Sequence, residues 1–508
     1  MQINQIKTGI VLNYVVIALN AITGLAYTPF MLRMLGQSEY GIYSLAGSMI
    51  AYLSMLDFGF GNAVIRYTAK YRAEDNNEKQ YCMFGMFTAL YCGIGIITLI
   101  AGGILYYNID SLFSAALTPT ELQHTHTIII LMLFNLAFSF PLSIYGAIIT
   151  AYEKFVFLRV IQIIKIIIST FTMVILLSYG HKAVAMVVVQ TVFNFIALGI
   201  NIIYCYNKLN IKVKFKNFDK KLFKEVSIYS FWIFLNDIIN RIYWSTGQFV
   251  LGSSLGTSSV AIFSVAISIT NMFWSFSTAI SSVFLPKVTK LITQKVSNSE
   301  ISNLFIKTGR VQFIMISFVL TLFVIFGKDF IILWAGSDYE NSYALAMMFL
   351  STLSIPLIQN LGITILQARN QMMFRSIVYV LISFLSLFFQ VVLTQLYGII
   401  GCGIAISGAL VLGHGIVMNI YYHNKQNIDI KKFWKEILKM AIAPTLLSIC
   451  FKIFLNIFKW NLNGLYNISI LVFVYIFFYI IIIWKFSMNE YEKNLVTAPL
   501  NKLKAKTI

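Results

Sequence analysis

Three charged side chains lie deep inside long apolar segments of the sequence: Lys165, Asp237 and Arg241. Each follows the start of its segment by about ten to fourteen residues, which in an α-helix corresponds to roughly 15 to 21 Å. At that depth in a bilayer, a charge that faces lipid costs about 2.5–3.5 kcal/mol. We therefore expect all three side chains to face an interior cavity, where the cations can bind an anion such as a phosphate.

The spacing of these residues distinguishes a structural ion pair from a site for an anionic ligand. Asp237 and Arg241 are four residues apart, so they can form an ion pair on one helix face that stabilises the fold without binding a ligand. Lys165 has Ile161 and Ser169 four residues to either side, and a serine hydroxyl cannot cancel its charge. Lys165 is therefore the stronger candidate for an anionic ligand, unless a carboxylate on another helix pairs with it.

Two further charged residues, Asp57 and Arg66, lie nine positions apart in one apolar segment. The Arg66 guanidinium can form two parallel hydrogen bonds to a phosphate, or it can anchor its helix at the membrane surface. The carboxyl groups of Asp57 and Asp237 are candidates to carry a proton, although a neighbouring arginine opposes protonation. Uncharged amides at similar depth suit a hydroxyl-rich ligand; they are Gln162, Gln190, Asn194, Asn236, Asn240, Gln359 and Asn360.

The elements that must position these residues are transmembrane helices. The chain of 508 residues is 58% hydrophobic with a mean hydropathy of +0.78, which is too apolar for a soluble protein. Its apolar segments can cross about 30 Å of hydrocarbon and lack the alternation of barrel strands. We predict an all-α polytopic membrane protein of about 14 helices. Their bounds are Thr8–Met31, Gly41–Tyr67, Met83–Tyr107, Thr127–Tyr152, Phe155–Tyr179, Ala183–Tyr204, Ser227–Leu251, Ser258–Pro286, Val311–Ala335, Tyr343–Ala368, Ile377–Tyr397, Gly401–Tyr422, Met440–Trp460 and Ile468–Lys485.

No motif for a chemical reaction accompanies these helices. The sequence has no P-loop, no HExxH or GxSxG motif and no His or Cys cluster with metal-ligand spacing, and its five cysteines include no CxxC pair. The longest outer loop, Asn108–His126, has about nineteen residues, too few for a catalytic domain. We predict a protein that is not an enzyme and that holds no cofactor or metal, with coupling to H⁺ or Na⁺ left open.

The formal net charge of +19 follows from the membrane topology. With the N-terminus in the cytoplasm, 31 of the 38 basic residues fall on the cytoplasmic side and three fall outside. This asymmetry is a strong positive-inside signal. It places both termini in the cytoplasm and explains the charge without a nucleic-acid partner, since no folded basic domain is present.

An internal repeat organises the helices. The segment Leu35–Lys70 recurs in diverged form at Leu255–Lys290, and the first fourteen aligned positions share seven residues. Six helices in each half give both halves the same orientation, so the repeat is parallel. We divide the chain into an N-lobe (1–206), a basic cytoplasmic linker (207–226), a C-lobe (227–423) and a last segment with two further helices and a cytoplasmic tail (424–508).

Two prolines occupy matching places in the halves. Pro141 lies near the middle of the fourth predicted helix and Pro356 near the middle of the tenth. Proline removes a backbone hydrogen bond and kinks a helix. We expect kinks at both positions, acting either as hinges that shape a cavity or as incidental bends.

The motifs of the first two helices resemble those of a known family. Residues Arg33–Gly36 (RMLG), Glu39–Tyr43 (EYGIY), Leu56–Gly59 (LDFG) and Ala63–Tyr67 (AVIRY), together with Leu285–Lys287 (LPK), are similar to the polysaccharide transport family, the Wzx-type O-antigen flippases. That family belongs to the superfamily of multidrug, oligosaccharidyl-lipid and polysaccharide exporters. The resemblance covers the whole chain in topology and these stretches in motif.

The resemblance implies two six-helix lobes around a cavity that opens alternately to either side of the bacterial plasma (inner) membrane. Its cargo would be an undecaprenyl-diphosphate-linked oligosaccharide, flipped from the cytoplasmic to the outer leaflet. Cationic residues that meet the diphosphate would be Lys165, Arg241 and Arg66, assigned by chemistry rather than by a motif match. The last two helices would accommodate the lipid tail, and membrane lipids and a glycan polymerase would be the partners.

Two alternatives stay open at this point. A cation-coupled multidrug antiporter of the same fold would favour carboxylates in the cavity, whereas the deep charges Lys165, Asp237 and Arg241 are two cations and one anion. A membrane glycan polymerase or ligase would need a large outer loop, which this chain lacks.

Overall fold

The computed structural model describes residues 5–216, 218–294, 296–369, 371–458, 460, 464–495 and 497. Over these residues the chain is helical throughout and contains no strand. It divides into two compact units, residues 1–264 and 265–508, which are described separately. The lobe boundaries predicted from the repeat stay a prediction.

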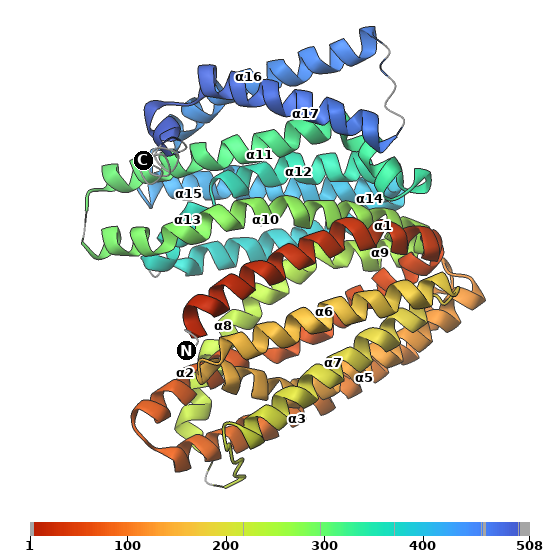
Figure 1. Ribbon diagram of the computed structural model, residues 1–508, viewed down its shortest axis with the longest axis vertical. Helices are drawn as coiled ribbons and strands as arrows, with labels where there is room; N and C mark the ends of the chain where they lie inside the picture. Colours follow the sequence, from red (N-terminus) through yellow and green to blue (C-terminus); the bar gives the residue numbers. More distant parts are fainter. Residues whose placement is uncertain are drawn as a thin grey trace, which may run out of the picture. The chain divides into compact units, whose positions relative to one another are not determined.

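The first unit contains the helices that carry most of the candidate residues (Figure 1). They are α1 (Gln5–Leu53), the 3₁₀ turn η1 (Ser54–Asp57), α2 (Phe60–Ala73), α3 (Asn77–Tyr107), α4 (Ile109–Phe113), α5 (Pro119–Ala151), α6 (Phe155–Ser178), α7 (Ala183–Asn207), α8 (Lys220–Trp244), α9 (Thr246–Leu255) and the start of α10 (Thr257–Thr293).

The second unit holds the rest of α10 and the helices that follow it. They are α11 (Asn298–Trp334), η2 (Ser337–Tyr339), α12 (Ser342–Ile358), α13 (Leu361–Ala368), α14 (Met372–Leu410), the π-helical turn η3 (Val411–Val417), α15 (Met418–Asn424), α16 (Ile430–Ile457), α17 (Leu465–Ile482) and the π-helical turn η4 (Ile483–Ser487).

These helices confirm the predicted polytopic all-α fold. Ten of the described helices are long and apolar enough to span a bilayer, and α12 with α13 form one further, bent span. Two of the ten, Thr8–Ala73 and Met372–Asn424, are long enough for two crossings each. Each of these two turns at a glycine in the left-handed region, Gly36 with φ 73° and Gly398 with φ 60°, a conformation that glycine adopts without strain.

The repeat is visible in the backbone at its first conserved glycine. Gly36 has φ 73° and ψ 175°, and Gly256, its partner in the repeat, has φ 83° and ψ −178°. In each half this residue ends one helix and turns the chain directly into the next. The two copies therefore share a corner geometry as well as a sequence pattern.

Helix breaks occur where the sequence analysis expected continuous spans. The second predicted helix is interrupted by η1 and by Phe58 and Gly59, which have φ 51° and 69°. After Pro356, α12 and α13 meet at a bend of 42°, which agrees with the expected kink. By contrast, α5 runs unbroken through Pro141.

In the first unit, α5 is the central helix, packing against α3 on one side and α7 on the other (Figure 1). Glycines permit this close packing: a Cβ atom added at Gly95 of α3 would lie 2.7 Å from the carbonyl oxygen of Ala137 in α5. Such small-residue contacts are a common way for transmembrane helices to associate. This contact brings the backbones of α3 and α5 close together.

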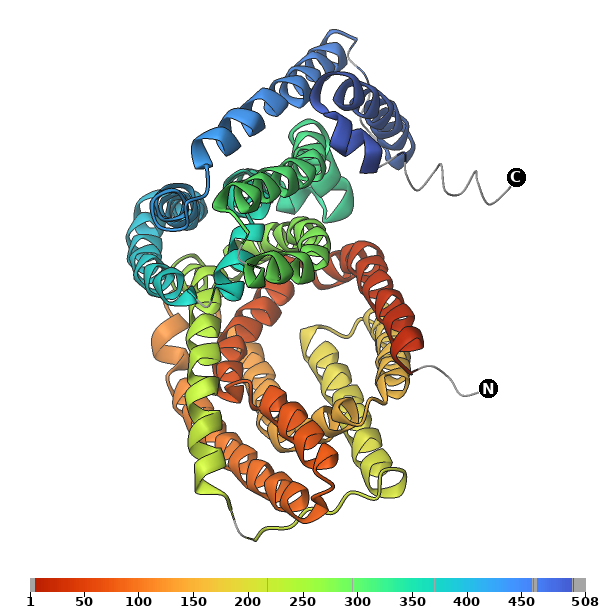
Figure 2. The ribbon, with the colours of Figure 1, turned by 90° about the vertical axis from the view of Figure 1, so that its left-hand side faces the viewer.

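In the second unit, α16 and α17 pack on α11 (Figure 2). Their apolar contact includes Phe326, Phe451 and Tyr475, and a buried ion-pair network stands at one end of it. Arg310 of α11 donates to Glu492 at 2.6 and 3.1 Å, to Glu436 at 2.8 Å and to the carbonyl oxygen of Ser487 at 3.0 Å. This network ties the end of the chain to α11.

We predict that Arg310→Met destabilises the protein by about 3–5 kcal/mol, because Glu492 (1% exposed) would be left as a buried, uncompensated charge. Thermal unfolding of the purified protein in detergent measures the loss. The double variant Arg310→Met/Glu492→Met should regain most of it, and Lys307→Met, one turn earlier on α11, should change little. Equal stability of Arg310→Met and the wild type would contradict a structural role for the network.

Candidate functional site

A pocket of about 440 Å³ in the first unit contains Lys165. The second half of α1 contributes Ile50, and the remaining walls come from α5, α6 and α7. The lining residues from those three helices are Met132, Asn135, Leu136, Ser139, Lys165, Ser169, Gln190, Phe193 and Asn194. One charged and several amide or hydroxyl side chains thus share an otherwise apolar pocket at the middle of the helices.

The sequence of α6 explains why Lys165 points into this pocket. An exposed apolar stripe runs along the helix at Ile164, Ile167, Ile168 and Phe171, the spacing of one continuous helix face. This stripe suits contact with lipid chains. Lys165 itself is half-buried and donates from its Nζ atom to Asn194 Oδ1 on α7 at 2.9 Å. Lys165 thus lines a polar pocket, and its role in ligand binding stays a prediction.

A chain of neutral hydrogen bonds holds Asn194 in place. Its Nδ2 atom donates to Asn135 Oδ1 and to Ser139 Oγ of α5, both at 2.8 Å. With its amide hydrogens committed to α5, the Asn194 oxygen is directed at Lys165. Of the described residues, no carboxylate lies within 4 Å of the Lys165 ammonium. The ammonium has three donors and uses one of them to bond Asn194, so it can bind an anion while keeping this contact.

Arg241 lies near the end of α8, beside the break that follows α1. Its Nη2 atom donates to Ser54 Oγ at 3.3 Å. Ser54 follows Ile50, which lines the Lys165 pocket, by one helical turn. Nearby, the Tyr52 hydroxyl forms a hydrogen bond with Thr246 at the start of α9. The side chain of Asp237 lies outside the described residues, so its pairing with Arg241 stays a prediction.

Asp57 ends the 3₁₀ turn at the helix break, where the chain passes through Phe58 and Gly59 in the left-handed region. Its carboxyl group bonds with the hydroxyl of Tyr91, a side chain that is only 1% exposed. The LDFG motif therefore folds as a turn within the span rather than as helix. The signal for it was present in the sequence, because Asp and Gly close together favour a turn.

Arg66 is not among the residues that line the Lys165 pocket. It is exposed on α2, with its guanidinium 5.6 Å from the centre of the Tyr67 ring. The break at η1, Phe58 and Gly59 lies between Asp57 and Arg66. A role for Arg66 in ligand binding stays a prediction.

Two pocket residues escaped the sequence analysis. Asn135 and Ser139 are four residues apart on α5 and both contact Asn194. Polar side chains at this spacing in an apolar helix occupy one face, so the pair could have been recognised. What could not be read from the sequence is that the α5 pair and Lys165 meet at the same residue of α7.

Solved structures of membrane proteins share this fold. Over 93% of the chain the structure is similar to the lipid II flippase MurJ in its inward closed conformation, with a TM-score of 0.69, 15% identity and 97% of that chain covered. An inward-facing MATE-family multidrug transporter of the MOP superfamily gives a TM-score of 0.59 at 13% identity, covering 80% of this chain and 98% of the transporter.

The sequence places the chain within one family. Residues 6–292 match the family described as "Polysaccharide biosynthesis protein", and the chain belongs to that family. It is also 21% identical over 404 residues to the "Putative O-antigen transporter" of Shigella flexneri, covering 77% of this chain and 92% of the relative. The chain is thus a multi-pass membrane protein of this family, which agrees with the family resemblance of its motifs.

We predict that the Lys165 pocket is hydrated. In a variant with the native cysteines replaced, Ser169→Cys in the pocket should react with a water-soluble maleimide, because polar side chains and a charge draw water into the space. Ile167→Cys on the apolar stripe of the same helix is the matched control and should react slowly, since thiolates do not form in lipid. Equal labelling of the two positions would contradict a hydrated pocket.

Proposed function

We propose that the protein flips an undecaprenyl-diphosphate-linked oligosaccharide, an O-antigen or capsule repeat unit, from the cytoplasmic to the outer leaflet by alternating access. The observation that carries this proposal is the Lys165 ammonium, which contacts a neutral amide at 2.9 Å and no carboxylate of the described residues. A cation maintained without a counter-charge at membrane depth is suited to an anionic ligand.

The chemistry of the pocket suits both parts of such a cargo. A diphosphate offers acceptor oxygens for the Lys165 ammonium and, across the segment Ile50–Ser54, for the Arg241 guanidinium. Sugar hydroxyls donate and accept, as do the amides of Asn135, Asn194 and Gln190. A sugar headgroup in hydrocarbon would leave all of these groups unsatisfied, so a polar, cationic path removes the barrier to crossing.

The multidrug antiporter is the main alternative, since that class shares the fold. A pocket for cationic drugs would need a carboxylate where this pocket has Lys165 and amides. Lysine repels a cationic ligand, so the charge of the pocket favours the anionic cargo. A glycan polymerase or ligase is less well supported, because the family and the relatives are named for biosynthesis and transport.

Further parts of the proposal concern the membrane and the partners. The asymmetry of basic residues supports insertion in the bacterial plasma (inner) membrane with both termini in the cytoplasm. Membrane lipids and the glycan polymerase machinery are the proposed partners, and nucleic acid is not. Coupling to H⁺ or Na⁺ belongs to the same proposal, with Asp57 and Asp237 as candidate carriers, and no other cofactor is required.

We predict that Lys165→Ala and Arg241→Ala each reduce transport by roughly 10- to 100-fold, the effect of losing a charge-assisted hydrogen bond worth about 1.5–3 kcal/mol. Surface glycan should be lost while the protein remains in the membrane, and the lipid-linked repeat unit should accumulate on the cytoplasmic leaflet.

Lys328→Ala is the matched control, because Lys328 is an exposed lysine paired with Glu340 at 2.7 Å outside the pocket. It should leave surface glycan unchanged. Resistance of the cells to cationic drugs should also be unchanged in all three variants. Normal glycan in both pocket variants would remove Lys165 and Arg241 from the site, and drug sensitivity without glycan loss would favour the antiporter.

A further inference from the structure

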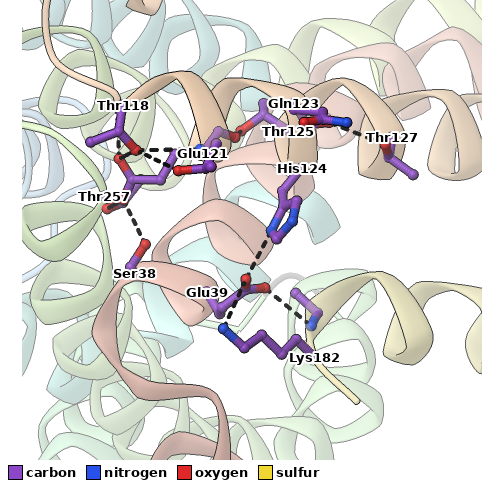
Figure 3. Close-up of polar contacts among 12 residues, drawn as sticks. Ser38, Glu39, Thr118, Glu121, Gln123, His124, Thr125, Thr127, Lys182 and Thr257 are labelled. Carbon is purple, nitrogen blue, oxygen red and sulfur yellow. Dashed lines mark hydrogen bonds and ion pairs between the residues drawn. The ribbon is translucent and has the colours of Figure 1, made fainter. Parts of the chain in front are cut away.

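Two carboxylates connect the ends of several helices of the first unit through hydrogen bonds and ion pairs (Figure 3). Glu121, in the first turn of α5, accepts hydrogen bonds from Ser38 of α1 at 2.5 Å and from Thr257 of α10 at 2.6 Å, both at Oε1. Its other oxygen accepts from the backbone N–H of Thr118 at 2.9 Å, as part of a capping box. One side chain thus connects the beginnings of α5 and α10 to the turn in α1.

The second carboxylate, Glu39, follows Ser38 on α1 and has a side chain that is only 7% exposed. His124 Nδ1 of α5 lies 2.8 Å from its Oε1 atom, and the Lys182 ammonium lies 3.8 Å from the same atom. Its Oε2 atom accepts from the backbone N–H of Ala183, the first residue of α7, at 3.3 Å. We call Ser38, Glu39, Glu121, His124, Lys182 and Thr257 the carboxylate latch.

The latch is separated from the Lys165 pocket by the same number of residues along three helices. On each of α1, α5 and α7, a latch residue or a residue bonded to the latch precedes a pocket residue by eleven positions. This spacing corresponds to a rise of roughly 16 Å along a helix. The pairs are Glu39 and Ile50, His124 and Asn135, and Ala183, which bonds Glu39, and Asn194. Between the two levels, Gln190 of α7 donates to the Tyr43 hydroxyl at 2.7 Å. Polar contacts therefore hold α1, α5 and α7 together between the latch and the pocket.

The contact between α1 and α10 differs from the other latch contacts because the two backbones approach closely. A Cβ atom at Gly41 of α1 would lie 2.1 Å from the carbonyl oxygen of Thr257, so the approach requires glycine. Thr257 begins α10, the helix that continues into the second unit, and it follows Gly256, the repeat partner of Gly36. The latch thus joins the corners that the repeat has in common.

We propose that this latch closes the outer end of the Lys165 pocket and that Thr257 must separate from Glu121 and Gly41 before cargo leaves for the outer leaflet. The inference rests on the proposed function and its orientation. Glu39, whose carboxylate is buried, joins α1, α5 and α7 through His124 and Ala183, and this contact stays intact. Glu121 and Ser38 are partly or fully exposed, so water can replace the hydroxyl of Thr257 when α10 moves.

The position of the latch can be tested without reference to the cargo. In right-side-out membrane vesicles, the Ser169→Cys reporter should react with an impermeant maleimide at least about tenfold faster when Thr257→Val is added, the shift expected from losing one hydrogen bond to a charged acceptor. Asp110→Asn is the matched control, because Asp110 pairs with His126 at 2.9 Å outside the latch. An unchanged rate with Thr257→Val would overturn the proposal.

A covalent cross-link across the latch should hold it closed, which is the opposite of the effect of Thr257→Val. Ser38→Cys/Thr257→Cys, joined by a short bifunctional thiol reagent, should lose transport and slow the labelling of Ser169→Cys, and cleavage of the reagent should restore both. Full transport in the cross-linked protein, or failure of the two thiols to cross-link, would contradict the latch. If the labelling rate of Ser169→Cys changes as expected but no variant transports the glycan, the latch is supported and the proposed cargo is contradicted.

Discussion

A lysine ammonium held at bilayer depth by neutral amides is the interaction on which the rest of the structure depends. Lys165 contacts Asn194 at 2.9 Å, and Asn194 is fixed by Asn135 and Ser139. An isolated charge of this kind is costly in an apolar environment. Its persistence requires a helix with one lipid-facing and one polar side, neighbours that supply amides, and space for water or an anion.

The helices meet these requirements in different ways. In α6, isoleucines and phenylalanine occupy the exposed face, which leaves the lysine directed inward. In α5, tight packing against α3 through Gly95 sets the rotation that presents Asn135 and Ser139. The break at Asp57–Gly59 then turns α2 away from the line of α1. Breaks of this kind place irregular backbone next to a transporter's binding region, where protein or water can satisfy it.

Much of the architecture was predictable because it follows from one-dimensional patterns. Apolar length predicted a polytopic all-α protein, and the repeat predicted equivalent positions at Gly36 and Gly256, which share a corner geometry. The break at the LDFG motif was missed, since a long apolar segment outweighed the turn signal of Asp57 and Gly59. Arg66, after this break, is exposed and is not among the residues that line the pocket.

Contacts between distant residues could not be predicted in this way. Glu39 and His124 are 85 residues apart, and Arg310 and Glu492 are 182 apart. Nothing in either local sequence identifies the partner, because the pairing depends on how whole helices pack. His124 in particular lies in the predicted outer loop Asn108–His126, whereas the fold places it against a buried carboxylate.

The central claim is that Lys165 recognises the anionic part of the cargo. The most direct measurement is the affinity of the purified protein in nanodiscs for an oligosaccharide linked to undecaprenyl diphosphate, compared with the same oligosaccharide on an uncharged polyprenol. The account predicts that the wild type binds the diphosphate form more tightly and that Lys165→Ala loses most of this preference. Equal affinities for the two ligands in the wild type, or an undiminished preference in Lys165→Ala, would contradict it.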